Sequence, residues 1–309
     1  MKPAVLITHK LLDTCETALD ARFDTRRLYQ AADRDAFLAE NAASVTAIAG
    51  GNVSADLMDR LPNLKMISNF GVGYDSIDTA AAKQRGISVT NTPDVLNDAM
   101  AEITIGLMVA LSRKIVPADA YTRAGKWPSG AYPLQTELRG KTVGIVGLGR
   151  IGKEIAARCQ MMKMRVVYFG RHQQMHQPFV YYDNLVDMAR DADWLVVITP
   201  GGKETERLVS ADVVEALGPN GFLCNMARGS VVDEPALVSA LQNGSIAGAA
   251  LDVFEDEPNV PEALFGMDNV VLSPHQGSAT NETRNAMGDL VVANLDAFFA
   301  GDPLLTPVV

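Results

Sequence analysis

The chain lacks several features that would each point to a particular class of protein. Its 309 residues include only 3 cysteines, and Cys15, Cys159 and Cys224 show no C-x-x-C spacing. An odd number of cysteines without that spacing argues against a disulfide framework and against a zinc site. Cys224 stands in an apolar run, so we expect it to be a small buried residue. These features fit the reducing cytoplasm and predict no bound metal.

Long apolar runs and clusters of positive charge are also missing. No apolar stretch reaches membrane-spanning length without a charge or a helix breaker, and the run near the first residue is too short for a signal peptide. The formal net charge is -10, and no run of Lys or Arg appears. We therefore expect neither a membrane nor a nucleic acid as partner, and any anionic ligand must be held by a local group of residues.

Apolar residues, in contrast, make up 48% of the chain, enough for the cores of two domains at this length. Short β-branched runs alternate with helical segments from end to end, which is typical of parallel sheets with crossover helices. The predicted strands are Ala4–Thr8, Val45–Ala49, Leu64–Asn69, Ile87–Thr90, Thr142–Val146, Arg165–Phe169, Trp194–Thr199, Gly221–Met226, Ile246–Asp252 and Asn269–Leu272. Among the predicted helices, one begins with Ser54 as its N-cap and another covers Asp78–Gln84.

The composition changes near Thr92-Pro93-Asp94, before an apolar helix predicted over Asn97–Lys114 that is long enough to connect two domains. The last predicted helix, Asn281–Ala300, is long enough to return the chain to the first domain. We therefore predict an α/β protein of two Rossmann-like domains with parallel sheets and a cleft between them. A discontinuous substrate domain (residues 1–97 and 282–309) encloses a continuous dinucleotide-binding domain (residues 98–281).

A glycine-rich loop follows the predicted strand Thr142–Val146 and opens a helix predicted over Arg150–Met162. Its pattern is G-x-G-x-x-G, formed by Gly147, Gly149 and Gly152. In dinucleotide-binding folds the first glycine permits a tight turn, the second lets the backbone approach a pyrophosphate, and the third allows close helix–strand packing. The N–H groups at the helix start, with Arg150 and Ile151, would then bind the phosphates. An ordinary glycine-rich turn is the alternative, but the position between strand and helix favours a dinucleotide site.

The next predicted strand ends in Gly170-Arg171-His172, and no acidic residue follows before Asp183. A site selective for NAD places Asp or Glu here to bind the ribose 2′-hydroxyl. A small residue followed by a guanidinium instead suits the 2′-phosphate of NADPH. We therefore predict NADPH as the cofactor, with NADH as the weaker one. The alternative is that Arg171 is a solvated loop cation.

Three polar residues follow predicted strands of the second domain, where ligands bind in open α/β sheets. Arg228 follows the strand ending at Met226, Glu257 lies in an acidic turn after Asp252, and His275 follows Leu272. Each alone has an ordinary explanation as a loop charge, a solvated turn or a structural histidine. Their common position beside a dinucleotide loop favours catalysis.

With these motifs the sequence resembles the D-isomer-specific 2-hydroxyacid dehydrogenase family over nearly its whole length, and within it the glyoxylate and hydroxypyruvate reductases. The motifs are Asn69–Asp78, the Gly147 loop, Met226–Glu234, Leu251–Pro258 and Pro274–Thr280. The resemblance implies that Arg228 binds the substrate carboxylate and carbonyl, that His275 is the general acid and that Glu257 pairs with it. It further implies a carboxylate contact from the N–H groups of Val72 and Gly73.

For the cofactor, the resemblance implies that Asp252 contacts the nicotinamide amide. The other residues implied beside the cofactor are Thr199, Pro200, Ala227, His275 and Gly277. One departure is Gly201-Gly202-Lys203 after Pro200, where many family members have a Leu/Thr-Pro segment. The resemblance also implies a homodimer through the nucleotide domains, with a contribution from Asn97–Tyr132. Trp127 then either reaches a neighbouring subunit's site or anchors its own loop.

The chemistry of these residues is coherent without the resemblance. Hydride addition to a keto carbon leaves an alkoxide that needs a proton, and histidine can donate one near neutrality. A neighbouring Glu257 favours the charged imidazolium, and Arg228 can bind carboxylate and carbonyl together. Closure of the two domains would exclude water.

We predict an NADPH-dependent reductase that converts glyoxylate and hydroxypyruvate to glycolate and D-glycerate. The alternatives are a reductase of bulkier 2-keto acids of the phenylpyruvate type and a nucleotide-sensing corepressor, which can keep the same triad. The sequence shows no extended disordered tail for recruiting partners, and this favours the enzyme.

Overall fold

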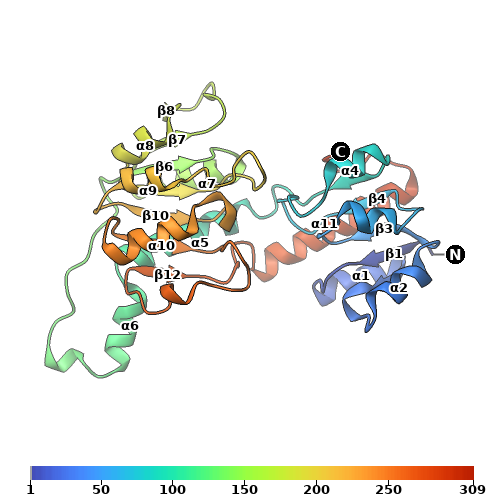
Figure 1. Cartoon of the computed structure of the whole chain (residues 1–309), viewed down its shortest axis with the longest axis horizontal. Coiled ribbons are helices and arrows are strands. Elements are labelled where there is room, and N and C mark those ends of the chain that lie inside the picture. The colour runs from blue at the N-terminus through green and yellow to red at the C-terminus, as the bar shows by residue number, and fades with distance from the viewer. Residues whose placement is uncertain (1) are drawn as a thin grey trace. The chain divides into compact units, whose positions relative to one another are not determined.

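The computed structural model describes residues 2–309, and the chain divides into two compact units (Figure 1). The first unit combines the chain up to Leu96 with Ser278–Val309, and the second unit is Asn97–Gly277. Each unit contains one parallel sheet with helices on both of its faces, which confirms the predicted α/β class.

The first unit is built on a five-stranded parallel sheet of order β2-β1-β3-β4-β5. Because the strand order reverses beside β1, the carboxyl ends of β1 and β3 flank a topological switch point, where ligands bind in open α/β sheets. Its elements are β1 (Ala4–Ile7), α1 (Asp13–Arg22), β2 (Asp24–Arg27), η1 (Leu28–Gln30), α2 (Arg34–Asn41), β3 (Val45–Ala49), α3 (Ala55–Asp59), β4 (Met66–Ser68), α4 (Thr79–Gln84), β5 (Ser88–Thr90) and α11 (Asn281–Ala300).

Two apolar clusters hold this sheet between its helices. Buried residues of α2, α3 and α4 pack on one face, and buried residues of α1 and α11 pack on the other. The predicted N-cap Ser54 is confirmed, since its hydroxyl accepts a hydrogen bond from Leu57 N. The helix predicted over Asp78–Gln84 begins at Thr79, and the Asp78 carboxylate caps it by accepting a hydrogen bond from Ala81 N.

The second unit is built on a seven-stranded parallel sheet of order β12-β11-β10-β9-β6-β7-β8. Read from β8, this is the order 3-2-1-4-5-6 of dinucleotide-binding sheets with one further strand, and its switch point lies between β6 and β9. Its elements are α5 (Asn97–Ser112), α6 (Ile115–Arg123), η2 (Trp127–Ser129), β6 (Thr142–Val146), α7 (Arg150–Met161), β7 (Arg165–Phe169), β8 (Val180–Tyr182), α8 (Leu185–Asp191), β9 (Trp194–Val197), α9 (Ala211–Leu217), β10 (Phe222–Asn225), η3 (Gly229–Val231), α10 (Glu234–Asn243), β11 (Gly248–Leu251), η4 (Glu262–Leu264) and β12 (Val270–Leu272).

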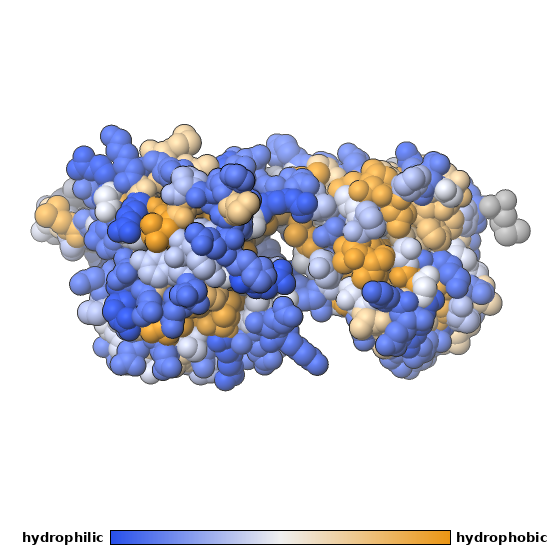
Figure 2. All heavy atoms as spheres, turned by 90° about the horizontal axis from the view of Figure 1, so that it is seen from above, coloured by the Kyte–Doolittle hydropathy of each residue, from blue (hydrophilic) through white to orange (hydrophobic). Residues whose placement is uncertain are grey.

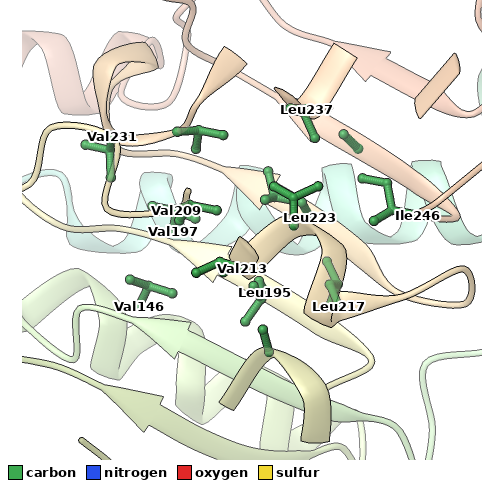
Figure 3. Packing of buried hydrophobic residues seen from close by; sticks show 14 of the residues in the cluster. Val146, Leu195, Val197, Val209, Val213, Leu217, Leu223, Val231, Leu237 and Ile246 are labelled. Atoms are coloured by element: carbon green, nitrogen blue, oxygen red, sulfur yellow. The ribbon is translucent and has the colours of Figure 1, made fainter. Parts of the chain in front are cut away.

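Both faces of this second sheet are covered by apolar side chains. Residues of α8, α9 and α10 pack against one face, including Val213, Leu217 and Leu237 around Leu195 and Leu223 (Figure 3). Residues of α5 and α7 pack against the opposite face. Because both faces are buried, the strands read as continuous apolar runs, which is why they could be located from the sequence.

The structure differs from the prediction mainly at the ends and edges of elements. Strands β2 and β8 were missed because both are short edge strands whose residues are only partly buried or exposed. Several strands end one or two residues earlier than predicted. The predicted helix Asn97–Lys114 ends at Ser112, because Lys114 has a left-handed φ of 46° from which α6 starts.

Polar and charged side chains cover most of the face in Figure 2, with separate hydrophobic patches between them. Within residues 2–309, no helix combines the length and the apolar character that a membrane crossing requires.

Candidate active site

Arg228 is held at the carboxyl end of β10 by its own neighbours. The Asn225 side chain, 2% exposed, donates to the Arg228 carbonyl over 3.0 Å and accepts from Ala227 N over 3.1 Å. The Arg228 guanidinium is partly buried and donates to the Ala227 carbonyl over 2.7 Å. These bonds fix the backbone from which the guanidinium extends.

Gly229 brings this strand end against the loop that carries Glu257. A Cβ atom at Gly229 would lie 1.9 Å from the carbonyl carbon of Phe254, so only glycine permits this approach. Phe254 N in turn donates to Glu257 Oε1 over 3.0 Å. Arg228 and Glu257 are therefore positioned through one close backbone contact.

His275 and Glu257 form the predicted pair. His275 Nδ1 lies 2.6 Å from Glu257 Oε2, and their side chains are 48% and 32% exposed. Because Glu257 occupies Nδ1, the other ring nitrogen, Nε2, is left to meet a reactant, and no described residue forms a hydrogen bond with it. This pair can therefore hold a proton on Nε2 of a ring whose orientation Glu257 fixes through Nδ1.

Asp252 anchors the loop that presents His275. The carboxylate is 1% exposed and accepts from the Ser273 hydroxyl, from Gln276 N over 2.9 Å and from Gly277 N over 2.8 Å. Its backbone carbonyl accepts from His275 N over 2.9 Å, while His275 has a positive φ of 48°. The contacts of Asp252 are thus those of a loop anchor, and its implied contact with a nicotinamide amide stays a prediction.

The glycine loop has the geometry that a pyrophosphate requires. Gly147 has a φ of 104°, which favours glycine, and a Cβ atom at Gly152 would lie 2.3 Å from the Gly147 carbonyl oxygen. Gly149 precedes the 12-residue helix α7 without a side-chain cap, and a Cβ atom there would meet nothing within 4 Å. The first-turn N–H groups of α7, which include those of Ile151 and Gly152, have no acceptor within the helix and suit an anion.

The residues at the switch point fit a dinucleotide. A Cβ atom at Gly147 would lie 3.0 Å from both the Ile198 carbonyl oxygen and Thr199 Cγ2, so β6 and β9 meet closely here. The Thr199 hydroxyl is buried and has no hydrogen-bond partner among residues 2–309, so it is a polar group available to a ligand. Pro200 and Ala227 follow β9 and β10 on the same edge of the sheet, and their implied contact with the cofactor stays a prediction.

The segment after β7 carries the residues predicted to select the cofactor. Gln174 Nε2 donates to the Leu148 carbonyl over 2.6 Å, which ties this segment to the glycine loop. Arg171 is 85% exposed and lies 3.8 Å from Glu204, which is 84% exposed. His172 is exposed as well. Glu204 was missed from the sequence, since it lies 33 positions away and only the packing of two loops brings it close.

In the first unit, two asparagines hold the loop that contains Val72 and Gly73. Asn69 Nδ2 donates to the carbonyls of Gly71 and Gly73 over 3.0 and 2.8 Å, and Asn91 Nδ2 donates to that of Val72 over 2.9 Å. Among residues 2–309, the N–H groups of Val72 and Gly73 have no hydrogen-bond acceptor. Both asparagines directly follow strands, so the signal that identified Arg228 would also have identified them.

The structure therefore gathers most of the predicted site residues on one edge of the second sheet. Strands β6, β7, β9, β10, β11 and β12 end before Gly147, Gly170, Thr199, Arg228, Asp252 and His275 respectively, and all are parallel. Val72 and Gly73 belong to the first unit.

Known proteins are similar to this chain over nearly its whole length. The family profile described as "D-isomer specific 2-hydroxyacid dehydrogenase, NAD binding domain" matches residues 105–277. A glyoxylate/hydroxypyruvate reductase of Arabidopsis thaliana is 46% identical over 99% of this chain and 98% of its own. A hydroxyphenylpyruvate reductase of Plectranthus scutellarioides is 49% identical over 95% of each chain. The solved structure of an NADPH-dependent glyoxylate/hydroxypyruvate reductase from Sinorhizobium meliloti, in complex with NADP and malonate, is 47% identical, covers 100% of this chain and 97% of its own, and superposes with a TM-score of 0.96.

Proposed function

Because the chain belongs to the D-isomer-specific 2-hydroxyacid dehydrogenase family, we propose that it reduces glyoxylate to glycolate and hydroxypyruvate to D-glycerate with NADPH. The family makes it an oxidoreductase, and its second unit is a nicotinamide-dinucleotide-binding domain. The observation that carries the proposal is the 2.6 Å contact between His275 and Glu257 on the sheet edge that also bears the glycine loop.

The residues have distinct tasks in this reaction. When bound, the reduced nicotinamide supplies a hydride to the keto carbon. Arg228 binds the carboxylate and carbonyl oxygens with its planar fork and stabilises the negative charge that develops on the carbonyl oxygen. His275 donates the proton from Nε2 to that oxygen, and Glu257 holds the ring and its positive charge through Nδ1.

The N–H groups of Val72 and Gly73 supply further donors to the substrate carboxylate. Support comes from their having no acceptor in the described chain, while Asn69 and Asn91 bind the carbonyls of the same loop. Backbone donors fixed in this way need no rearrangement when an anion arrives.

The preference for NADPH is the finer part of the proposal. Support comes from Arg171 next to Gly170, from the tie between Gln174 and the glycine loop, and from the relative solved with NADP. The exposed ion pair with Glu204 is weak and yields easily to a doubly charged 2′-phosphate.

A second candidate substrate is 4-hydroxyphenylpyruvate, because one relative of 49% identity is named a hydroxyphenylpyruvate reductase. The test is NADPH oxidation with glyoxylate, hydroxypyruvate and 4-hydroxyphenylpyruvate, each over a full concentration range. We expect the highest kcat/KM with glyoxylate or hydroxypyruvate. A higher value with 4-hydroxyphenylpyruvate would establish the second candidate, and no oxidation with any of the three would overturn the function.

We also propose that the protein is a homodimer. The segment from α6 to Leu134 forms an arm that extends away from the seven-stranded sheet (Figure 1). Helix α6 has no buried residue, and Val116, Trp127 and Leu134 are 58%, 67% and 100% exposed. Apolar side chains exposed along one arm suit contact with a second copy. The mass in solution, measured by light scattering, should equal that of two chains, and the mass of a monomer would exclude the proposal.

The cytoplasmic location stays a prediction.

A further inference from the structure

A pocket of about 400 Å³ lies in the first unit, within the size range of small-molecule sites. It is lined by His9 and Lys10, by the apolar Leu11, Leu12 and Phe70, and by the start of α11 with Thr280 and Arg284. No carboxylate is among its lining residues. The lining therefore combines basic and apolar side chains and has no acidic one.

The pocket lies at the switch point of the five-stranded sheet. His9 follows β1 and Gly50 follows β3, the two strands that flank that point. The two loops are tied together, because the Thr8 hydroxyl donates to the Gly51 carbonyl over 2.8 Å. A Cβ atom at Gly50, where φ is 122°, would lie 2.5 Å from the Thr8 hydroxyl and 3.0 Å from His9 Cε1. The topology thus places this pocket where doubly wound sheets bind their ligands.

Arg284 brings a positive charge that no carboxylate of the described chain neutralises. Its guanidinium lies 5.6 Å from the centre of the Phe70 ring, and no ion pair or side-chain hydrogen bond joins it to any of residues 2–309. Partial burial lowers the pKa of Arg284. A cation withdrawn from water without a partner is unfavourable, and a bound anion would remove that cost.

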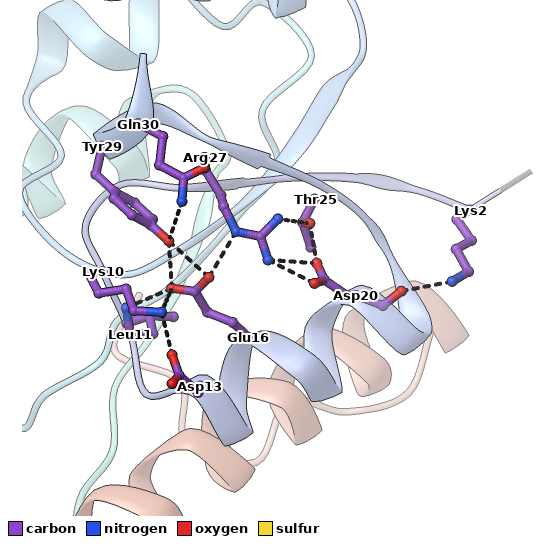
Figure 4. A network of polar contacts seen from close by, with 10 residues as sticks. All are labelled: Lys2, Lys10, Leu11, Asp13, Glu16, Asp20, Thr25, Arg27, Tyr29 and Gln30. Carbon is purple, nitrogen blue, oxygen red and sulfur yellow. Dashed lines mark hydrogen bonds and ion pairs between the residues drawn. The ribbon is translucent and has the colours of Figure 1, made fainter. Parts of the chain in front are cut away.

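The neighbouring basic residues show that this situation is specific to Arg284. Lys10 pairs with Asp13 and Glu16, and Arg27 pairs with Glu16 and Asp20 (Figure 4). These charges are balanced within the network around α1. The charge of Arg284 alone is left for a ligand.

His9 and the start of α11 also line the pocket. Burial and the charge of Arg284 lower the pKa of His9. His9 Nδ1 lies 3.3 Å from the Thr8 hydroxyl and 3.5 Å from Gly51 N, so Nδ1 is engaged within the first unit, while Nε2 has no hydrogen-bond partner among residues 2–309. Helix α11 is 20 residues long, and the Thr280 hydroxyl caps only Thr283 N, so the positive helix end adds to the field.

We propose that this pocket binds the distal carboxylate of 2-oxodicarboxylates, which are then substrates of the same reduction. The inference rests on the proposed function, because Phe70 lies two positions before Val72, in the loop that we assign to the first carboxylate. Leu11 and Leu12 contact the methylene groups between the two ends, and Arg284 and His9 bind the far carboxylate. The chemistry is unchanged: the keto carbon gains a hydride from NADPH, its oxygen gains a proton from His275, and NADP⁺ is released.

The test compares pairs of substrates of equal shape and different charge. Oxaloacetate is paired with 4-methyl-2-oxopentanoate, and 2-oxoglutarate with 5-methyl-2-oxohexanoate, because an isopropyl group has the shape of a carboxylate without its charge. In at least one pair, kcat/KM should be about ten- to a hundredfold higher for the dicarboxylate. A factor of this size corresponds to the free energy that a charge-assisted hydrogen bond typically contributes. Glyoxylate, which has no distal group, reports the basic reaction in every variant.

Two variants and a control then locate the effect. Arg284→Gln should bring the ratio within each pair close to one and leave glyoxylate reduction intact. Leu12→Asp should also bring the ratio close to one and leave glyoxylate reduction intact, because it adds a carboxylate to the pocket while Arg284 stays in place. Leu12 is the N-cap of α1, a position that favours Asp. Arg22→Gln removes an equal charge that pairs with Asp296 on α11, outside the pocket lining, and should keep the parent ratio.

The outcomes separate this inference from the function on which it rests. A parent that reduces glyoxylate but shows no preference for either dicarboxylate overturns the distal site and leaves the proposed function standing. A preference that survives in both Arg284→Gln and Leu12→Asp also overturns it. If the parent reduces no 2-keto acid, the proposed function itself has failed.

Discussion

The preference for NADPH over NADH should be reversible by changes in a single loop, the one that follows β7. The change is Gly170→Asp combined with Arg171→Ala, which puts a carboxylate after β7 and removes the guanidinium. A Cβ atom at Gly170 meets nothing within 4 Å, so the aspartate can be added without repacking. We expect the parent to prefer NADPH and the double variant to prefer NADH, because repulsion of the 2′-phosphate replaces attraction and the ribose hydroxyls gain an acceptor.

The size of the effect follows from the exposure of Arg171. A charge-assisted hydrogen bond contributes about 1.5–3 kcal/mol, which corresponds to a factor of about 10 to 100. Arg171 is 85% exposed, so solvent screening places the parent's preference near the lower end of that range. The competing pair with Glu204, at 3.8 Å and 84% exposed, opposes it by at most about 1 kcal/mol. Glu204→Gln should therefore raise the NADPH preference by no more than about fivefold.

The assay is kcat/KM for NADPH and for NADH with saturating glyoxylate at one fixed ionic strength. Arg165→Ala is the matched control, because it removes an exposed arginine from the opposite end of the same strand. It should leave the ratio of the two constants unchanged. A parent that prefers NADH would show that Arg171 is only a solvated loop cation, and an unchanged ratio in the double variant would refute the assignment of the Gly170 segment.

Three further changes test the chemistry and its framework. His275→Ala should lower kcat for glyoxylate by roughly 10²–10⁴-fold with an unchanged Kd for NADPH, and near-parental turnover would remove His275 from proton transfer. Arg228→Lys keeps the charge but loses the planar fork, so KM should rise and kcat should fall; two unchanged constants would exclude bidentate recognition. Gly229→Ala should cost about 1–3 kcal/mol of unfolding free energy or more, because its Cβ would lie 1.9 Å from the Phe254 carbonyl carbon. Gly170→Ala, which meets nothing within 4 Å, is the control, and equal Tm values for the two variants would contradict that reasoning.

Much of the second unit could be predicted because its strands are buried on both faces and its site residues follow them. The glycine loop, Arg228 and His275 were identified by their position after apolar runs, and the parallel sheet brings such positions to one edge. Strands β2 and β8 escaped prediction because edge strands are short and need little apolar surface.

Contacts between segments that are distant in the chain could not be predicted from the sequence. The ion pair of Arg171 with Glu204 and the approach of Gly229 to Phe254 depend on how loops pack, which no local pattern records. The pocket in the first unit is the extreme case, because His9 and Arg284 are 275 positions apart in the chain and meet only through the packing of α11.

We propose above all that this chain transfers a hydride from NADPH to a 2-keto acid and gives the D-isomer of a chiral product. The most direct measurement incubates the protein with hydroxypyruvate and NADPH, quantifies the glycerate formed against the NADPH consumed, and resolves its enantiomers by chiral chromatography. We expect D-glycerate in a one-to-one ratio with the NADPH oxidised. L-Glycerate, or oxidation of NADPH without glycerate, would contradict it.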